Sequence, residues 1–224
     1  MQGGYRNLGY ILLVFPLIIL AGFWIPYFSQ FPTFAPSITA TVHIHALLLF
    51  AWAGLLVIQP LTIRNRAYSI HRILGKASYV MMPLVVVFSI VMLRKEYQEN
   101  LAAGTNVVAA GSAEYLSTIQ VTLFAAFYGL AIGRILKRDT AEHMRYMICI
   151  ALVLLPAGLA RTLGYWFGVN QAASQTVCLA LIDVCLIFLI VYDRRRHFAA
   201  RPYIVALAAY GIMETGWLVL GRPV

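Results

Sequence analysis

Histidines at the starts of two long apolar stretches are the residues of this 224-residue chain most able to carry chemistry. His71 and His143 begin stretches that would lie on different helices at one depth. Two imidazoles placed in this way can ligate the iron of haem b, one from each side. Arg72 and Arg145 lie beside them in sequence and would neutralise the haem propionates. The alternative is that both histidines lie at the membrane interface and bond to carbonyls or lipid phosphates.

A second group of candidate ligands lies toward the other ends of the apolar stretches. His43 and His45 begin one of them, and Asp183 and Glu214 lie within two others. Imidazole with carboxylate suits zinc and also tolerates copper. On an ideal helix the two histidines point about 200° apart. Both can therefore bind one metal only if the helix begins irregularly.

Further polar and aromatic residues recur at helical spacing within the apolar stretches. His45, Trp52 and Gln59 follow one another at intervals of seven residues, which places them along one side of a helix. Arg161 falls on the helix face of His143, and Tyr210 falls on the face of Glu214. Because polar groups are costly in lipid, these residues should face the interior of a bundle. An ion pair of Arg161 with Glu214 or Asp183 that only fixes helix packing is the alternative.

Composition decides what kind of element positions these residues. Hydrophobic residues make up 62% of the chain and charged residues 11%. Soluble domains are near 45–50% apolar and about 25% charged. This composition excludes a soluble globular enzyme and indicates an all-α, polytopic bundle of transmembrane helices in contact with a lipid bilayer. The net charge of +9 then reflects cationic loops, and we expect no nucleic-acid partner.

Seven apolar stretches are long enough to cross a bilayer, since about 20 helical residues span its hydrocarbon. They form a single transmembrane domain, residues 1–224, with a polar loop over 94–112 as its longest connection. The predicted spans are residues 8–28, 40–62, 71–93, 114–136, 143–166, 173–192 and 203–220. Gly129 and Gly133 form a GxxxG pair that predicts close packing against another helix of this chain or of a second copy in a homo-oligomer.

Lys and Arg residues concentrate on one side of these seven spans. The opposite side holds Arg94, Lys95 and Arg222, whereas Arg161 lies within a span. Cytoplasmic loops are enriched in Lys and Arg, so the N-terminus is predicted to be cytoplasmic and the C-terminus to be outside. The residues on the predicted cytoplasmic side are Arg6, Arg64, Arg66, Arg72, Lys76, Arg134, Lys137, Arg138, Arg145, Arg194, Arg195, Arg196 and Arg201.

Short motifs over residues 40–165 carry a family resemblance. His43-Ile-His45 with Trp52 and Gln59, then His71-Arg72-Ile-Leu-Gly75, then His143-Met-Arg145 resemble a group of uncharacterised bacterial multi-pass membrane proteins that is distantly similar to cytochrome-b-type haem membrane proteins. The resemblance implies a bacterial inner-membrane location, and haem or quinone chemistry at His45, His71 and His143. The chain departs from the cytochrome-b pattern because paired histidines are absent on one leaflet.

Three functions follow from these observations. The first is a redox protein that binds haem b or a metal and exchanges electrons with a quinone or a partner protein. The second is a transporter or channel that moves protons or a small anion along the interior polar residues. The third is an accessory subunit whose buried polar contacts fix assembly. Whether the chain is an enzyme is left open by its residues.

Overall fold

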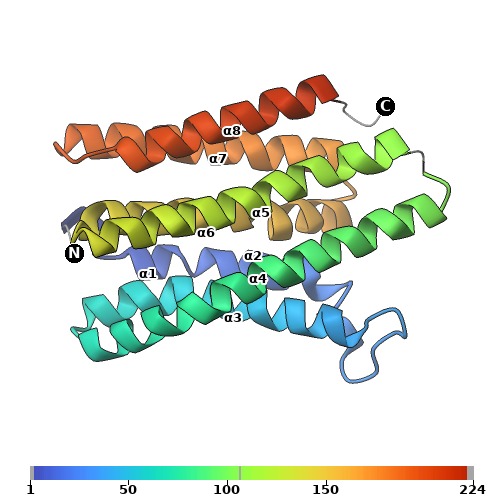
Figure 1. Cartoon of the computed structure of the whole chain (residues 1–224), viewed down its shortest axis with the longest axis horizontal. Coiled ribbons are helices and arrows are strands. Elements are labelled where there is room, and N and C mark those ends of the chain that lie inside the picture. Colours follow the sequence, from blue (N-terminus) through green and yellow to red (C-terminus); the bar gives the residue numbers. More distant parts are fainter. Residues whose placement is uncertain (1–2, 106, 221–224) are drawn as a thin grey trace.

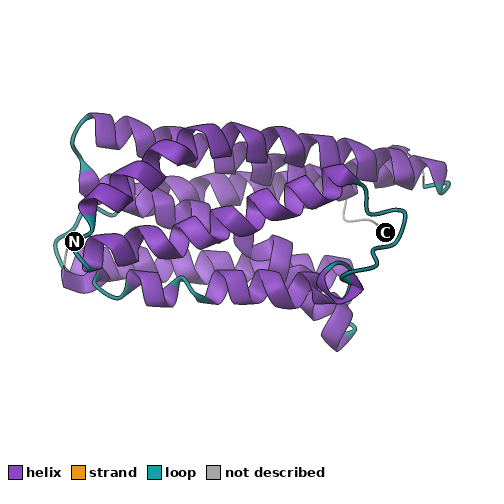
Figure 2. Cartoon of the chain, turned by 90° about the horizontal axis from the view of Figure 1, so that it is seen from below, coloured by secondary structure: helices purple, strands orange, loops and turns teal. Residues whose placement is uncertain are grey.

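The computed structural model describes residues 3–105 and 107–220, and within these ranges every regular element is a helix. Two short 3₁₀ helices, η1 (Gly3–Tyr5) and η2 (Phe28–Gln30), flank the first helical segment. The α-helices are α1 (Leu8–Ile11), α2 (Val14–Trp24), α3 (Ala40–Arg64), α4 (Tyr68–Ala102), α5 (Val107–Leu136), α6 (Thr140–Phe167), α7 (Gln171–Arg195) and α8 (Arg201–Leu220). Figure 1 shows the long helices running roughly along one axis. In Figure 2 the connections between them lie at the two ends of the bundle.

Six of the described helices, α3 to α8, are long and apolar enough to cross a membrane. This confirms a multi-pass helical membrane protein. The first predicted span is a shorter apolar segment, Leu8–Trp24, in which α1 and α2 are separated at Leu12 and Leu13. A seventh crossing and the orientation of the termini therefore stay predictions, and Arg222 lies outside the described residues.

The predicted loop over residues 94–112 is wrong for most of its length. Helix α4 continues to Ala102 and α5 begins at Val107. The polar residues at the end of α4 are good helix formers with no Gly or Pro among them. Lys95 and Glu99 are also one helical turn apart, with Nζ and Oε1 at 3.7 Å. Polarity alone was therefore a poor sign of a loop here.

Helix α6 lies at the centre of the bundle, where it packs against α2, α5, α7 and α8. Over its most apolar 18 residues 56% are buried, against 11% for α4. A capping residue marks each end of α6. The Asp139 side chain accepts from the backbone N–H of Glu142 at 3.0 Å, and Gly168 ends the helix in the left-handed region at φ 67°. Residues of α6 can thus reach interior space on several sides.

Close helix contact occurs at a glycine pair that the sequence did not single out. Gly22 of α2 lies against the backbone of Gly158 in α6, and a Cβ built on Gly158 would lie 2.9 Å from a side-chain methyl of Ile18. By contrast, nothing lies within 4 Å of a Cβ built on Gly129 or Gly133. The GxxxG pair therefore makes no close helix contact within the described chain, and its role between two copies stays a prediction.

Replacement of Gly22 by alanine tests the α2–α6 contact. The new methyl group would meet backbone atoms of Gly158 that cannot rotate away, so Gly22→Ala should destabilise the protein by about 1–3 kcal/mol. The control is Gly211→Ala in α8, where a Cβ would meet nothing within 4 Å. Thermal unfolding in detergent should show a lower midpoint for the first variant alone. Equal midpoints for both variants would contradict this packing.

Candidate functional site

A buried ion pair joins α6 to α7 at the end of the bundle where the N-terminal residues lie. The Nε atom of Arg145 is 2.5 Å from Oδ2 of Asp193, and both side chains are almost fully buried. The hydroxyl of Tyr5 donates to the other carboxylate oxygen of Asp193 at 2.7 Å and lies 3.2 Å from the hydroxyl of Tyr203 in α8. Three segments of the chain therefore meet at one carboxylate, and α8 joins them through the contact of Tyr203 with Tyr5.

The surroundings of this ion pair complete its hydrogen bonding. The guanidinium of Arg145 also donates to the carbonyl of Ala141 at 2.9 Å and lies 5.5 Å from the centroid of the Tyr5 ring. Burial raises the pKa of the Tyr5 hydroxyl above its ordinary value, which keeps this group protonated as a donor. Arg145 thus has a structural partner in Asp193 and does not line the cavity that contains the histidines.

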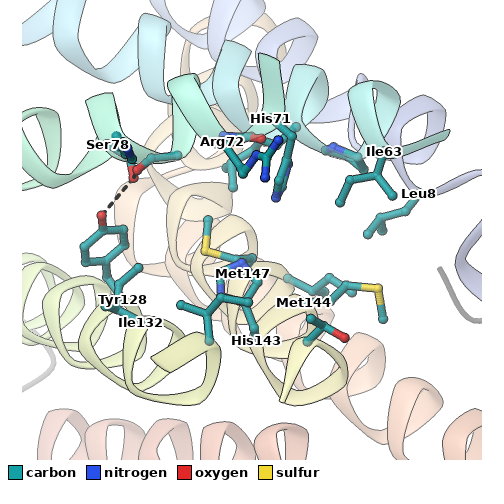
Figure 3. Close-up of a pocket in the computed structure, with 18 of the residues that line it drawn as sticks. Leu8, Ile63, His71, Arg72, Ser78, Tyr128, Ile132, His143, Met144 and Met147 are labelled. Carbon is teal, nitrogen blue, oxygen red and sulfur yellow. Dashed lines mark hydrogen bonds between the residues drawn. The ribbon is translucent and has the colours of Figure 1, made fainter. Parts of the chain in front are cut away.

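His71 of α4 and His143 of α6 line one cavity of about 850 Å³ at this same end of the bundle. We call it the histidine cavity. Figure 3 shows the two side chains reaching it from different helices, with Met147 between their positions. Leu56, Ile132 and Met144 contribute to a largely apolar wall. The two histidines that the sequence paired by depth therefore do share one interior space.

One ring nitrogen of each histidine is engaged by the protein. Nδ1 of His143 lies 2.9 Å from the carbonyl oxygen of Ala131 in α5, so a proton on this nitrogen is donated to that carbonyl. Nδ1 of His71 contacts the side-chain amide of Gln59 in α3. Gln59 donates its nitrogen to this Nδ1 when its oxygen accepts from the backbone N–H of Gly75 at 2.9 Å. These contacts involve Nδ1 of both histidines and do not involve Nε2.

Cations and hydroxyls also line the histidine cavity. Arg72 and Lys76 lie on the first turns of α4 and are exposed, so their charges border an otherwise apolar space. The hydroxyls of Ser78 and Tyr128 are 2.8 Å apart and join α4 to α5 (Figure 3). A ligand that fits this lining has an apolar body and an anionic or polar edge.

A second cavity of about 320 Å³ lies toward the opposite end of the bundle. His45 of α3 and Arg161 of α6 line it together with Gln120 of α5 and Gln175 of α7, and we call it the glutamine cavity. His43 is not among its lining residues; its Nδ1 lies 2.7 Å from the hydroxyl of Tyr27, which does line the cavity. The two histidines of the HxH motif therefore have different surroundings, as an ordinary helix dictates.

Asp183 and Glu214 contact each other between α7 and α8, and neither lines the glutamine cavity. Tyr210, fully buried, faces the same pair. Arg161 forms no ion pair with either carboxyl among the described residues; it donates to the carbonyl of Ala157 at 3.0 Å and lies over the Phe23 ring at 4.8 Å. In the described ranges no three His, Cys, Asp or Glu residues gather as a metal site.

An aromatic layer separates the two cavities. The indole of Trp52 is 1% exposed and packs against Phe124 at 5.0 Å and Tyr128 at 5.6 Å between ring centroids. Phe124 lines the glutamine cavity and Tyr128 lines the histidine cavity. Of the predicted polar row on α3, His45 thus lies at one cavity, Gln59 at the other, and Trp52 between them.

Sequence reasoning missed Asp193, Gln120 and Gln175. Asp193 is followed directly by Arg194, Arg195 and Arg196, so it resembled part of a solvated cationic turn. An acid at the end of an apolar helix, opposite an arginine at matching depth, was the available signal. The two glutamines are uncharged, although an amide within an apolar stretch also needs an interior partner.

Comparison with protein-family models, with curated proteins and with solved structures finds no match for this chain. The function is therefore inferred from the geometry described above and from the residue motifs of the sequence.

Variants of the buried ion pair should show strong coupling. Arg145→Met leaves the Asp193 carboxylate without its cation, which should cost about 3–5 kcal/mol of unfolding free energy. Asp193→Leu should cost a similar amount, and the double variant should cost much less than the sum. The control pair is Lys95 with Glu99, whose exposure limits it to about 0–1 kcal/mol. Additive effects at Arg145 and Asp193 in chemical unfolding would contradict the buried pair.

Proposed function

We propose that this chain is a redox protein of a bacterial inner membrane that binds haem b in the histidine cavity. One observation supports this most directly: His71 and His143 line the same largely apolar space from two helices, and the contacts found at each ring among the described residues are made by Nδ1. The resemblance to cytochrome-b-type proteins points the same way. In this proposal the Leu8–Trp24 segment also crosses the bilayer, with the basic end of the bundle in the cytoplasm.

The donor set fits haem b. Histidines that ligate a metal usually donate their other ring nitrogen to a carbonyl or a carboxylate, which fixes the ring. His143 has such a partner in the carbonyl of Ala131. The lining is apolar enough for a porphyrin, and Arg72 and Lys76 supply cations for its propionates. Arg72 keeps the role that the sequence gave it, whereas Lys76 takes the place of Arg145, which is paired to Asp193.

Gln59 adds a condition on this assignment. A ligating His71 carries its remaining proton on Nδ1, so the amide of Gln59 must present its oxygen to it. The amide orientation that completes the hydrogen bonds of Gln59, with its oxygen accepting from the backbone N–H of Gly75, donates to Nδ1 and places the proton of His71 on Nε2. Ligation of haem by His71 therefore requires this amide to turn over and give up the bond from Gly75. Gln59 thus selects between a ligating and a non-ligating tautomer of His71. Bound haem would supply one-electron transfer, and the chain's own residues hold and orient it.

Visible absorption of the purified full-length protein tests the proposal. Expression with added haem precursor should give a Soret band with a reduced α-band typical of bis-histidine b-type haem. His71→Ala and His143→Ala should each abolish this low-spin spectrum, because each removes one of the two histidines that would hold the iron. The control is His197→Ala, since His197 is exposed at the end of α7.

Two results would overturn the haem assignment. One is wild-type protein without a Soret band when the haem supply is ample. The other is a low-spin spectrum that survives in both histidine variants. A pyridine haemochrome assay on the same samples should give one haem per chain for the wild type and for His197→Ala.

The aromatic layer favours a second candidate function, which is transport of protons or a small anion. Two cavities on opposite sides of a closed layer resemble the two half-paths of a gated pathway. In that case Trp52, buried between Phe124 and Tyr128, is the barrier. Gln59 and His45 would then be the polar groups on its two sides.

Flux measurements separate this candidate from the redox function. If the protein transports, Trp52→Ala should raise proton or anion flux into proteoliposomes several-fold, since it removes the largest side chain of the layer. The control is Trp166→Ala, whose indole is 53% exposed and donates to the carbonyl of Ala21. Flux that equals empty liposomes in the wild type and in both variants would exclude transport.

A further inference from the structure

The glutamine cavity contains buried polar atoms that lack partners. Nδ1 of His45, Nε2 of Gln120 and Oε1 of Gln175 make no hydrogen bond to any residue that the structure describes. These atoms come from α3, α5 and α7, and all three residues line the cavity. Buried polar atoms in proteins are nearly always paired, so each such exception needs a physical cause. Three exceptions around one space indicate a molecule that binds there.

The remaining lining indicates a neutral ring rather than an ion. Phe23, Phe28 and Phe124 give the cavity an aromatic and apolar wall. The cation of Arg161 and the acid of Glu96 both border it, so the charges of the lining offset each other. A small anion would require an excess of cations in this space, whereas an apolar ring with carbonyl groups requires a few donors.

The donors and acceptors suit both states of one ligand class. The Nε2 atom of Gln120 has N–H groups to donate to a carbonyl oxygen, and the guanidinium of Arg161 has further donors. Oε1 of Gln175 can accept from a hydroxyl. His45 can do either, according to its tautomer. A quinone offers carbonyl oxygens, and its reduced form offers hydroxyls at the same positions.

The cavity also reaches the side of the bundle. Phe50 of α3 lines it and is 41% exposed on the helix surface that would contact lipid. A long apolar tail attached to a ring could leave the cavity there and lie in the bilayer. Quinones of membranes have this form, whereas a small polar solute does not.

We propose that the glutamine cavity binds the headgroup of a membrane quinone, with Gln120 as a donor to its carbonyl oxygen and Gln175 as an acceptor from the quinol hydroxyl. This inference rests on the proposed redox function in that the quinone is the electron partner of the protein. The ligand site itself stands on a different cavity and on different residues from those of the haem.

Binding of decylubiquinone to the purified full-length protein in nanodiscs tests the proposal. Calorimetric titration should show saturable binding to the wild type. Gln120→Leu and Gln175→Leu should each raise the Kd about tenfold or more, because leucine has a similar size and no polar atoms. Two substitutions are matched controls that should leave the Kd unchanged, Thr122→Val on α5 and Thr176→Val on α7. Both threonines are exposed, and each hydroxyl bonds to a carbonyl of its own helix.

The outcomes decide the ligand site and the haem separately. A Soret band without saturable quinone binding would overturn the quinone site and leave the haem assignment standing. Saturable binding that both glutamine variants weaken, in protein without a Soret band, would support the site and overturn the haem. Quinone binding that both glutamine variants retain would overturn the site. If Tyr79→Phe and Met147→Ala, in the lining of the histidine cavity, then lost quinone binding, the quinone would belong to that cavity instead. A gel-filtration profile and unfolding midpoint equal to those of the wild type qualify each variant for comparison.

Discussion

The buried pair of Arg145 with Asp193 fixes the position of the central helix, and the other interior contacts depend on that position. Neither charge can be left alone in an apolar bundle, so α6 and α7 are held in one register at this end. Tyr5 adds the N-terminal segment to the same carboxylate, and Tyr203 joins α8 to it through the hydroxyl of Tyr5. His143 lies two residues before Arg145 on α6, so the pair also determines how this histidine meets the wall of its cavity.

The polar residues of the bundle fall into separate groups at different depths. Tyr5, Arg145 and Asp193 are paired with one another, with the carbonyl of Ala141 and with the hydroxyl of Tyr203, and such a set needs no ligand. The polar groups at the two cavities are different. At the histidine cavity the described contacts of His71 and His143 involve Nδ1 and not Nε2. At the glutamine cavity side-chain atoms of Gln120 and Gln175 have no hydrogen-bond partner among the described residues. A polar group in an apolar interior is therefore informative chiefly when the protein itself does not complete its hydrogen bonds.

The sequence predicted the helical class, most helix positions and the placement of His71 and His143 at one depth. These follow from the lengths of the apolar stretches and from the position of each residue within its stretch. It placed Arg145 at the haem because it could assign depth but not the direction of a side chain among several neighbouring helices. The same limit applies to Arg161, whose expected partners Asp183 and Glu214 contact each other instead. The end of α4 was missed for another reason, since polar helix-forming residues extend a helix beyond the apolar span.

The closed centre of the bundle bears on the choice between the two functions. A path for ions or protons must be polar and open along its length, at least in passing, whereas Trp52, Phe124 and Tyr128 are 1%, 3% and 7% exposed and the Trp52 ring packs against both of the others. Transport would require these packed rings to separate during each transport cycle. Electron exchange between ligands in the two cavities requires no such opening, because packed aromatic side chains can remain in place between donor and acceptor. The packed layer is thus compatible with the proposed redox function as it stands, whereas the transport candidate requires the layer to open as a gate.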